Sequence, residues 1–177
     1  RGDLISVIRT LYPFLKAELF LKWEDAELKD QICAYVDALI NAKLIAADAE
    51  DHLISPAPNS EDHNQLVVLA APVMQSLERY YMTLALITQR GSGNISIRQV
   101  EELSHLVGQR LSVLYEFNSP EFFDKALFQS FMKVLTQQGY IRNNEDNAIV
   151  FDENFQNVAQ YANLVLDDVT LQMLQHI

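Results

Sequence analysis

The sequence predicts a mainly α-helical fold with short β-hairpins (α+β), a helical domain with one or two winged-helix-like helix-hairpin units. Apolar residues recur three or four positions apart over most of the chain, which is the period of an amphipathic helix. Proline, glycine and capping residues divide those stretches into separate helices. Two helical stretches each run into a short apolar segment and an acidic turn, which is typical of a hairpin.

The N-terminal segment predicts two helical pieces that meet at Pro13. Leu4, Ile8 and Leu11 are spaced as on one helix face, and Pro13 is expected to break or kink that helix. A second piece then runs from 12 to 23 with aromatic or aliphatic groups on almost every side. A helix that is apolar all round is normally buried or packed on another domain, so this piece is a candidate interdomain or membrane interface, with ordinary core as the alternative. The candidate interface residues are Tyr12, Phe14, Leu15, Phe20 and Trp23.

A further helix and a loop with strand candidates follow. Asp25 and Glu27 favour a helix start because acidic side chains stabilise the positive N-terminal end of a helix. The polar stretch 48–64, which contains two prolines, is the most loop-like part of the chain. Residues 52–55 could form a short strand within it, and residues 66–69 are the matching strand candidate.

Start and stop signals define the next two helices. Pro72 suits the first position of a helix because that position needs no backbone N–H donor, and Gly91 with Gly93 ends the helix. Ser96 and Gln99 have the spacing of a capping box, in which each side chain bonds the backbone N–H of the other residue. Apolar residues three or four apart then predict an amphipathic helix.

The rest of the chain predicts a helix, a hairpin and a last helix. Ser119, Pro120 and Glu121 combine a cap, a first-position proline and an acid at the positive helix end. Gly139 closes that helix in the left-handed conformation that glycine adopts cheaply. Segments 140–141 and 148–151 flank a polar turn and predict a small hairpin. The last helix carries Phe155, Val158, Ala162, Val165 and Val169.

We expect two segments in the chain: 1–70, a helical segment with a helix-hairpin unit, and 71–177, a winged-helix-like helical unit with a C-terminal helix. Residues 36–45 and 132–141 share the plan of a helix that enters a short strand. Both segments are expected to pack as one C-terminal domain. We expect this domain to belong to a longer chain, because the helical spacing of apolar residues already begins a few residues after Arg1.

Composition and charge exclude several classes of function. Lys and Arg number 13 against 24 Asp and Glu, so the net charge is −11, which argues against nucleic acid and against electrostatic docking on anionic lipid. The expected helix 119–139 offers only Lys125 and Lys133 as cations, so it would not bind a phosphate backbone. Cys33 is the only cysteine, which excludes an intramolecular disulfide and a Cys-rich zinc site. The longest apolar run, 66–74, is far below the ~18 residues that a membrane span needs.

No set of residues for catalysis is evident. An acyl transfer to an alcohol would use a His as general base and an Asp five residues later, and none of the four histidines has an Asp there. A metal site of His52 and His63 with Asp51, Glu61 or Asp62 is conceivable, but solvated loop histidines are the better interpretation, because loop ligands without fixed geometry bind weakly. We predict no catalytic, cofactor-binding or metal-binding residues and no cofactor.

Five segments follow one another in an order that a known family shares. They are 12–21 (YPFLKAELFL), 77–80 (LERY), 109–114 (QRLSVL), 119–128 (SPEFFDKALF) and 139–141 (GYI). Together they resemble the C-terminal region of the bacterial membrane-associated glycerol-3-phosphate 1-O-acyltransferase family. The resemblance covers nearly the whole chain, and the block from 109 to 141 is its most specific part.

The resemblance implies a parent enzyme that moves a fatty acyl group from acyl carrier protein or acyl-CoA to the first hydroxyl of glycerol 3-phosphate in phospholipid biosynthesis. In that family the His-x4-Asp motif lies upstream, so the resemblance implies a non-catalytic C-terminal domain that supports the catalytic domain or membrane association. The implied partners are the upstream catalytic domain, the inner membrane through the parent, and acyl carrier protein or acyl-CoA as substrate of the parent, with no nucleic acid. The implied location is the cytoplasmic face of the bacterial inner membrane, with the fragment itself soluble and inactive.

A second function stays open from the sequence. The predicted helix-hairpin plan also fits a free-standing winged-helix-like protein-interaction module without enzymatic activity. Acyl carrier protein is itself acidic, so we expect it to bind elsewhere on the parent rather than on this acidic chain.

Overall fold

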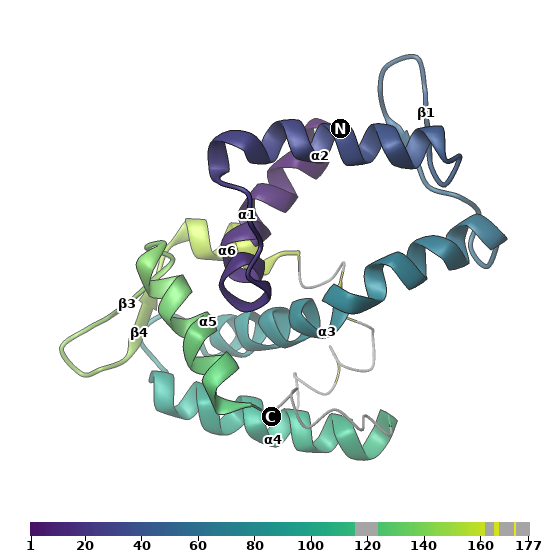
Figure 1. The fold of residues 1–177 in the computed structure, drawn as a ribbon. Helices are drawn as coiled ribbons and strands as arrows, with labels where there is room; N and C mark the ends of the chain where they lie inside the picture. Colours follow the sequence, from purple (N-terminus) through teal and green to yellow (C-terminus); the bar gives the residue numbers. More distant parts are fainter. Residues whose placement is uncertain (116–123, 162–164, 167–171, 173–177) are drawn as a thin grey trace. The chain divides into compact units, whose positions relative to one another are not determined.

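The structure is a computed structural model that describes residues 1–115, 124–161, 165–166 and 172. The described chain is mainly helical with two small antiparallel strand pairs (Figure 1), which confirms the predicted class. The chain divides into two compact units, unit 1 (Arg1–Val73) and unit 2 (Met74–Ile177). Among the described residues, no helix combines the length and the hydrophobicity that crossing a bilayer requires.

Unit 1 is built on a pair of helices, α1 (Gly2–Leu19) and α2 (Asp25–Asn41). α1 continues through Pro13, so of the expected break or kink the break is wrong. A proline removes one N–H to the carbonyl four residues earlier, and here that carbonyl belongs to Arg9, an exposed residue that water can reach. The helix also continues because Tyr12 is held in a buried cluster with Leu28, Ile32 and Val36 of α2.

The first hairpin pairs β1 (Ala46–Ala47) with β2 (Leu53–Ile54) in antiparallel register, Ala46 opposite Ile54. The strand expected at 52–55 is therefore confirmed, but its partner is β1. Residues 66–69, the expected partner, lie inside a helix, α3 (Glu61–Arg90). The periodicity of a short apolar run does not distinguish a strand from a helix. Here a helix start signal precedes the run: the hydroxyl of Ser60 accepts a hydrogen bond from the backbone N–H of His63 at 3.2 Å, and residues 66–69 continue that helix.

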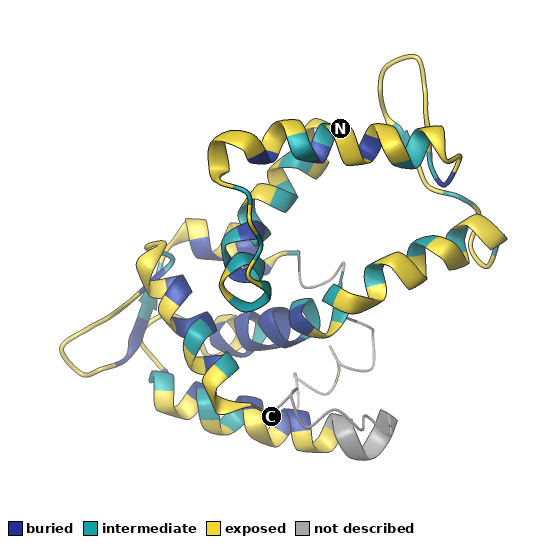
Figure 2. Cartoon of the chain, viewed as in Figure 1, coloured by how far each residue is buried: buried dark blue, intermediate teal, exposed yellow. Residues whose placement is uncertain are grey.

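Pro72 also lies inside α3, eleven residues after the helix begins, so its assignment as the first helical residue is wrong. The carbonyl that loses its partner belongs to Val68, whose side chain is 70% exposed, and water can replace the missing donor. From Arg79 to Leu84 every residue of α3 is buried, and this part of the helix forms the centre of the unit 2 core (Figure 2). Within that core the ring of Tyr80 stacks on Phe131 with centroids 4.5 Å apart.

Within the described residues, unit 2 adds three helices and a hairpin to this buried part of α3. Gly91 and Gly93 end α3 with positive φ angles of 81° and 84°, as predicted. The predicted capping box is confirmed, because the backbone N–H of Ser96 donates to the Gln99 side-chain oxygen at 2.9 Å and that of Gln99 donates to the Ser96 hydroxyl at 3.3 Å. The elements are α4 (Ile97–Tyr115), α5 (Lys125–Gln137), β3 (Ile141–Asn143), β4 (Ile149–Phe151) and α6 (Glu153–Ala159).

The second hairpin is confirmed, and its returning strand also pairs with the segment before α4. The backbone N–H of Ile149 donates to the Ile95 carbonyl at 2.7 Å, and the N–H of Gly93 donates to the Ile149 carbonyl at 2.8 Å. Along the chain, the described part of unit 2 therefore begins with α3, followed by the short segment that pairs with β4, then α4, α5 and the hairpin of β3 and β4. The finer winged-helix assignment stays a prediction.

Some predicted signals fall outside the described residues. The start signal Ser119 to Glu121 is among them; the described α5 begins after Asp124, whose carboxylate accepts the backbone N–H of Ala126 at 2.7 Å. Gly139 follows α5 with a φ of 76°, as predicted. Of the last predicted helix, Phe155 and Val158 are buried on α6, whereas Ala162 and Val169 lie outside the described residues.

Candidate functional site

The corner between α1 and α2 carries the most exposed of the predicted interface residues, Phe20. It ends α1 in the left-handed region, with a φ of 53°, and its side chain is 91% exposed. A bulky residue in this conformation costs about 1–2 kcal/mol, and its exposed ring recovers no burial energy from the described chain. A strained and exposed aromatic residue is a reason to look for a partner at this corner.

Two further aromatic residues lie at the same corner. Trp23 is half-buried, and its ring meets Tyr35 of α2 edge to face at 5.7 Å. The ammonium of Lys22 lies 5.3 Å from the Trp23 ring centroid. The spacing of apolar residues along α2 predicts Tyr35 on the buried stripe beside Val36, yet Tyr35 is 54% exposed, because a helical stripe is defined only to within one position. Tyr35 was not among the predicted interface residues.

The other predicted interface residues are less accessible. Tyr12 is buried in the unit 1 cluster, and its hydroxyl donates to the Trp23 carbonyl at 2.9 Å. Phe14 is buried, and Leu15 is half-buried. The predicted set therefore divides: Tyr12 helps to hold the corner together, whereas Phe20 presents a ring to solvent.

Exposed large apolar side chains are concentrated in unit 1. Among the described residues only Leu106, at 39% exposed, belongs to unit 2. Three of those in unit 1 are consecutive on the N-terminal half of α3. We call the strongly exposed members the unit 1 apolar set: Phe20, Tyr35, Ile54, Val67, Val68 and Leu69. Single exposed apolar residues are ordinary, but Val68 and Leu69 line one shallow hollow on α3, and contiguous exposed apolar area is a feature of interaction surfaces.

The acidic loop between β1 and β2, which precedes Ile54, holds its own hydrogen bonds. The carboxylate of Asp48 accepts the backbone N–H of His52 at 2.8 Å and that of Glu50 at 2.9 Å, and it also contacts His52 Nδ1 at 3.0 Å. These bonds, first the one from the His52 backbone, lower the pKa of Asp48 below its ordinary value. Within the described part of the chain, no three His, Cys, Asp or Glu side chains are grouped as metal ligands.

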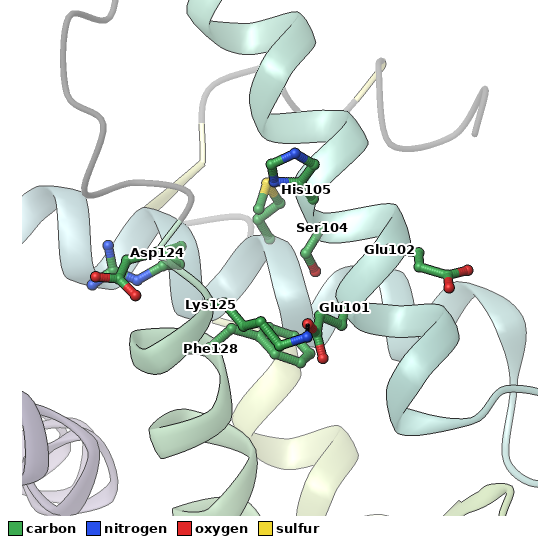
Figure 3. Close-up of a pocket in the computed structure, with 9 residues that line it drawn as sticks. Glu101, Glu102, Ser104, His105, Asp124, Lys125 and Phe128 are labelled. Carbon is green, nitrogen blue, oxygen red and sulfur yellow. Dashed lines mark ion pairs between the residues drawn. The ribbon is translucent and has the colours of Figure 1, made fainter.

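Unit 2 contains a partly enclosed cavity of about 290 Å³ between α3, α4 and α5 (Figure 3). Met82 of α3 and Phe128 of α5 contribute apolar walls, and Ser104 of α4 contributes a hydroxyl. Lys125 lies at its edge and forms an ion pair with Glu101 at 2.5 Å. No sequence motif predicts this cavity, because its lining comes from three helices with no shared spacing.

The described residues that line the cavity include no activated nucleophile. Ser104 is 8% exposed, and its hydroxyl has no hydrogen-bond partner among the described residues. The neighbouring His105 instead contacts the side-chain amide of Gln109 at 3.0 Å through Nε2. A serine nucleophile needs a base within hydrogen-bond reach, so this arrangement suits binding rather than covalent chemistry.

Comparisons with known proteins identify relatives over most of the chain. The family described as glycerol-3-phosphate acyltransferase C-terminal region matches residues 1–144. A glycerol-3-phosphate acyltransferase of Ectopseudomonas mendocina is 38% identical over 145 residues, which are 82% of this chain and 17% of that protein. One of Pseudomonas aeruginosa is 36% identical over 162 residues, 92% of this chain and 19% of that protein.

A third relative gives the same picture. A glycerol-3-phosphate acyltransferase of Pseudomonas putida is 35% identical over 160 residues, 90% of this chain and 19% of that protein. No solved structure matches the chain. The chain spans less than a fifth of the length of these curated relatives. With the family match over more than half of its residues, the chain belongs to the family of glycerol-3-phosphate acyltransferase C-terminal regions.

Proposed function

We propose that the chain is the non-catalytic C-terminal domain of a glycerol-3-phosphate 1-O-acyltransferase. The parent would transfer an acyl group from acyl carrier protein or acyl-CoA to glycerol 3-phosphate, in phospholipid biosynthesis at the cytoplasmic face of the inner membrane. The family and the printed names of the relatives support the parent activity. The small share of each relative that the chain spans supports a division of labour, in which the chemistry belongs to the rest of the parent.

The observation that carries the supporting role is the unit 1 apolar set. Burying one exposed Phe or Leu side chain contributes about 1.5–3 kcal/mol, so a partner that covers Phe20 and Val68 would gain substantially. Glu61 lines a shallow hollow together with Val68 and Leu69, and Asp48 and Glu50 lie in the loop of the hairpin that carries Ile54. Such a surface favours a basic protein partner over anionic lipid. We therefore assign the unit 1 apolar set to contact with the catalytic part of the parent.

The test is made in the full-length parent with the double variant Phe20→Ser/Val68→Ser. Both side chains are exposed, so the fold of unit 1 should survive. A contact that buries each side chain only in part draws about 2 kcal/mol from the two together, less than the ~3 kcal/mol minimum for two fully buried side chains, and losing it weakens the contact roughly thirty-fold. We expect a separately expressed catalytic part to bind this chain about thirty-fold more weakly, and acyltransferase activity of the parent to fall.

Leu106→Ser is the matched control, because it makes the same kind of change on the exposed face of α4 in unit 2. It should leave both binding and activity unchanged. Phe14→Ser provides a second comparison: Phe14 is buried, so it should lower the melting temperature of the chain, which the Phe20→Ser change should not. Full activity and full binding in the double variant would contradict the assignment.

A second candidate function is a free-standing winged-helix-like interaction module. The bonds that join Ile95 to Ile149 favour it, because they attach the hairpin to the segment before α4 and give unit 2 a self-contained order of elements. Deletion of the residues that match this chain from a parent enzyme separates the two proposals. Unchanged activity and membrane attachment after deletion would favour the free-standing module.

A further inference from the structure

We propose that the cavity of unit 2 binds a small neutral ligand with an aromatic body and one hydroxyl, a simple phenol, and that the ligand hydroxyl bonds the Ser104 hydroxyl. This site is separate from the unit 1 apolar set and does not depend on it. The cavity volume of about 290 Å³ lies at the lower end of the range of small-molecule pockets. It corresponds to about ten water molecules at ~30 Å³ each, enough for a single substituted ring.

The walls favour an aromatic body. Met82 brings a polarisable thioether, which contacts aromatic ring edges favourably, and Phe128 brings a ring that is 6% exposed. The aliphatic stem of Lys125 extends the apolar lining, while its ammonium reaches Glu101 (Figure 3). A planar apolar group between α3 and α5 would therefore replace water along most of the cavity wall.

The polar groups favour a neutral ligand, because the charged ones already have partners. Glu101 pairs with Lys125, and Glu102 pairs with Arg98 at 3.0 Å. Asp124 accepts a backbone N–H at the start of α5. The guanidinium of Arg79 lies over the Tyr80 ring at 5.8 Å. A charged ligand would have to displace one of these contacts, and an anion would also face three carboxylates.

The hydroxyl of Ser104, which lines the cavity, has no hydrogen-bond partner in the described part of the chain. In Figure 3 its hydroxyl points from α4 toward the side of the cavity where Phe128 and Lys125 lie. A buried hydroxyl without a partner is uncommon in native proteins, since its desolvation is not compensated. One ligand hydroxyl would satisfy it, because a hydroxyl both donates and accepts.

The experiment titrates p-cresol and toluene into the intact 177-residue chain and follows backbone amide shifts by NMR. We expect saturable shifts at α4 and at the start of α5, with p-cresol binding about five- to tenfold more tightly than toluene, the range that one hydrogen bond supplies. Benzoate and benzylamine, of similar size but charged, should bind more weakly than p-cresol.

Ser104→Ala isolates the hydroxyl. It should weaken p-cresol to the level of toluene and leave toluene unchanged or slightly tighter, whereas Ser104→Thr, which keeps a hydroxyl, should keep the preference for p-cresol. N-acetyl-tyrosinamide separates the two sources of a phenol: binding at least as tight as p-cresol points to a tyrosine of a polypeptide, and weaker binding to a free phenol. Equal affinity of p-cresol and toluene for the unsubstituted chain, or shifts that do not saturate, would overturn the proposal.

Discussion

Two buried side-chain hydroxyls of unit 2 lack a hydrogen-bond partner within the described residues, and they differ in what surrounds them. Ser104 lines a cavity, whereas Tyr81 is fully buried on α3. Burial raises the pKa of Tyr81 above its ordinary value, with a smaller contribution from Tyr161. Ser104 can be satisfied by a ligand, but Tyr81 stays a destabilising feature of the core.

Tyr81→Phe should therefore stabilise the chain. It removes a buried hydroxyl without a described partner, whose desolvation costs about 1–3 kcal/mol, so the free energy of unfolding measured in urea should rise by about 1 kcal/mol. Tyr35→Phe is the matched control, because its hydroxyl is on an exposed ring, and it should have no effect. A decrease in stability for Tyr81→Phe would mean that the hydroxyl has a partner.

The same change should alter stability at high pH. In the unfolded chain Tyr81 ionises near pH 10, whereas in the folded chain its raised pKa keeps it neutral. Ionisation of Tyr81 therefore leaves the free energy of unfolding unchanged well below pH 10 and lowers it as pH rises from about 10 toward the folded pKa. Urea unfolding between pH 9 and pH 11 should show a smaller loss of stability in Tyr81→Phe than in the unsubstituted chain.

Asp48 in unit 1 makes stability depend on pH at the acidic end of the range, whereas Tyr81 does so at the alkaline end. The folded pKa of Asp48 is lowered, so its contribution to the first hairpin is present above the ordinary pKa of 3.8 and is lost as pH falls through the lowered value. The amide shifts of Glu50 and His52 should titrate together with a midpoint below 3.8. Asp48→Asn should abolish that titration; a midpoint at or above 3.8 would show that the bonds are absent in solution.

At the scale of elements, sequence signals for where a helix begins or ends were reliable when they correspond to a specific hydrogen bond of the backbone. The Ser96 capping box and the glycine ends of α3 and α5 could be read from the sequence because each satisfies specific N–H or C=O groups. Pro13 and Pro72 misled, since a missing N–H is tolerated where the freed carbonyl faces water. The run 66–69 misled because an apolar run is compatible with either element.

Pro72 provides a test of this explanation. Pro72→Ala restores the N–H that the Val68 carbonyl lacks, and alanine is about 3 kcal/mol more favourable than proline inside a helix. The free energy of local opening of α3 around Val68 should rise by up to about this amount, seen as slower amide hydrogen exchange from 68 to 76. Pro58→Ala, in the turn before α3, is the control and should leave these rates unchanged.

At the scale of the whole molecule, the family could be recognised from the order of its segments, whereas the candidate sites could be predicted only in part. Phe20 and Trp23 were selected because their segment is apolar all round, yet that pattern cannot tell buried Tyr12 from exposed Phe20. That difference arises where α1 ends and α2 packs back on it. The unit 2 cavity escaped prediction because Met82, Ser104 and Phe128 meet only in the fold.

The exposed apolar residues and the net charge of −11 oppose each other in the isolated chain. At neutral pH, like charge keeps the molecules apart. Near the sequence pI of about 4.6 that repulsion vanishes, and exposed apolar surface can drive association. Sedimentation velocity from pH 7 to pH 4.6 should show the chain associating as the pI is approached, with Phe20→Ser/Val68→Ser requiring several-fold higher concentration. The double variant keeps the same charge, so only its apolar area differs. Leu106→Ser should behave as the unsubstituted chain, and equal association of all three proteins would show that the unit 1 apolar set is not the surface involved.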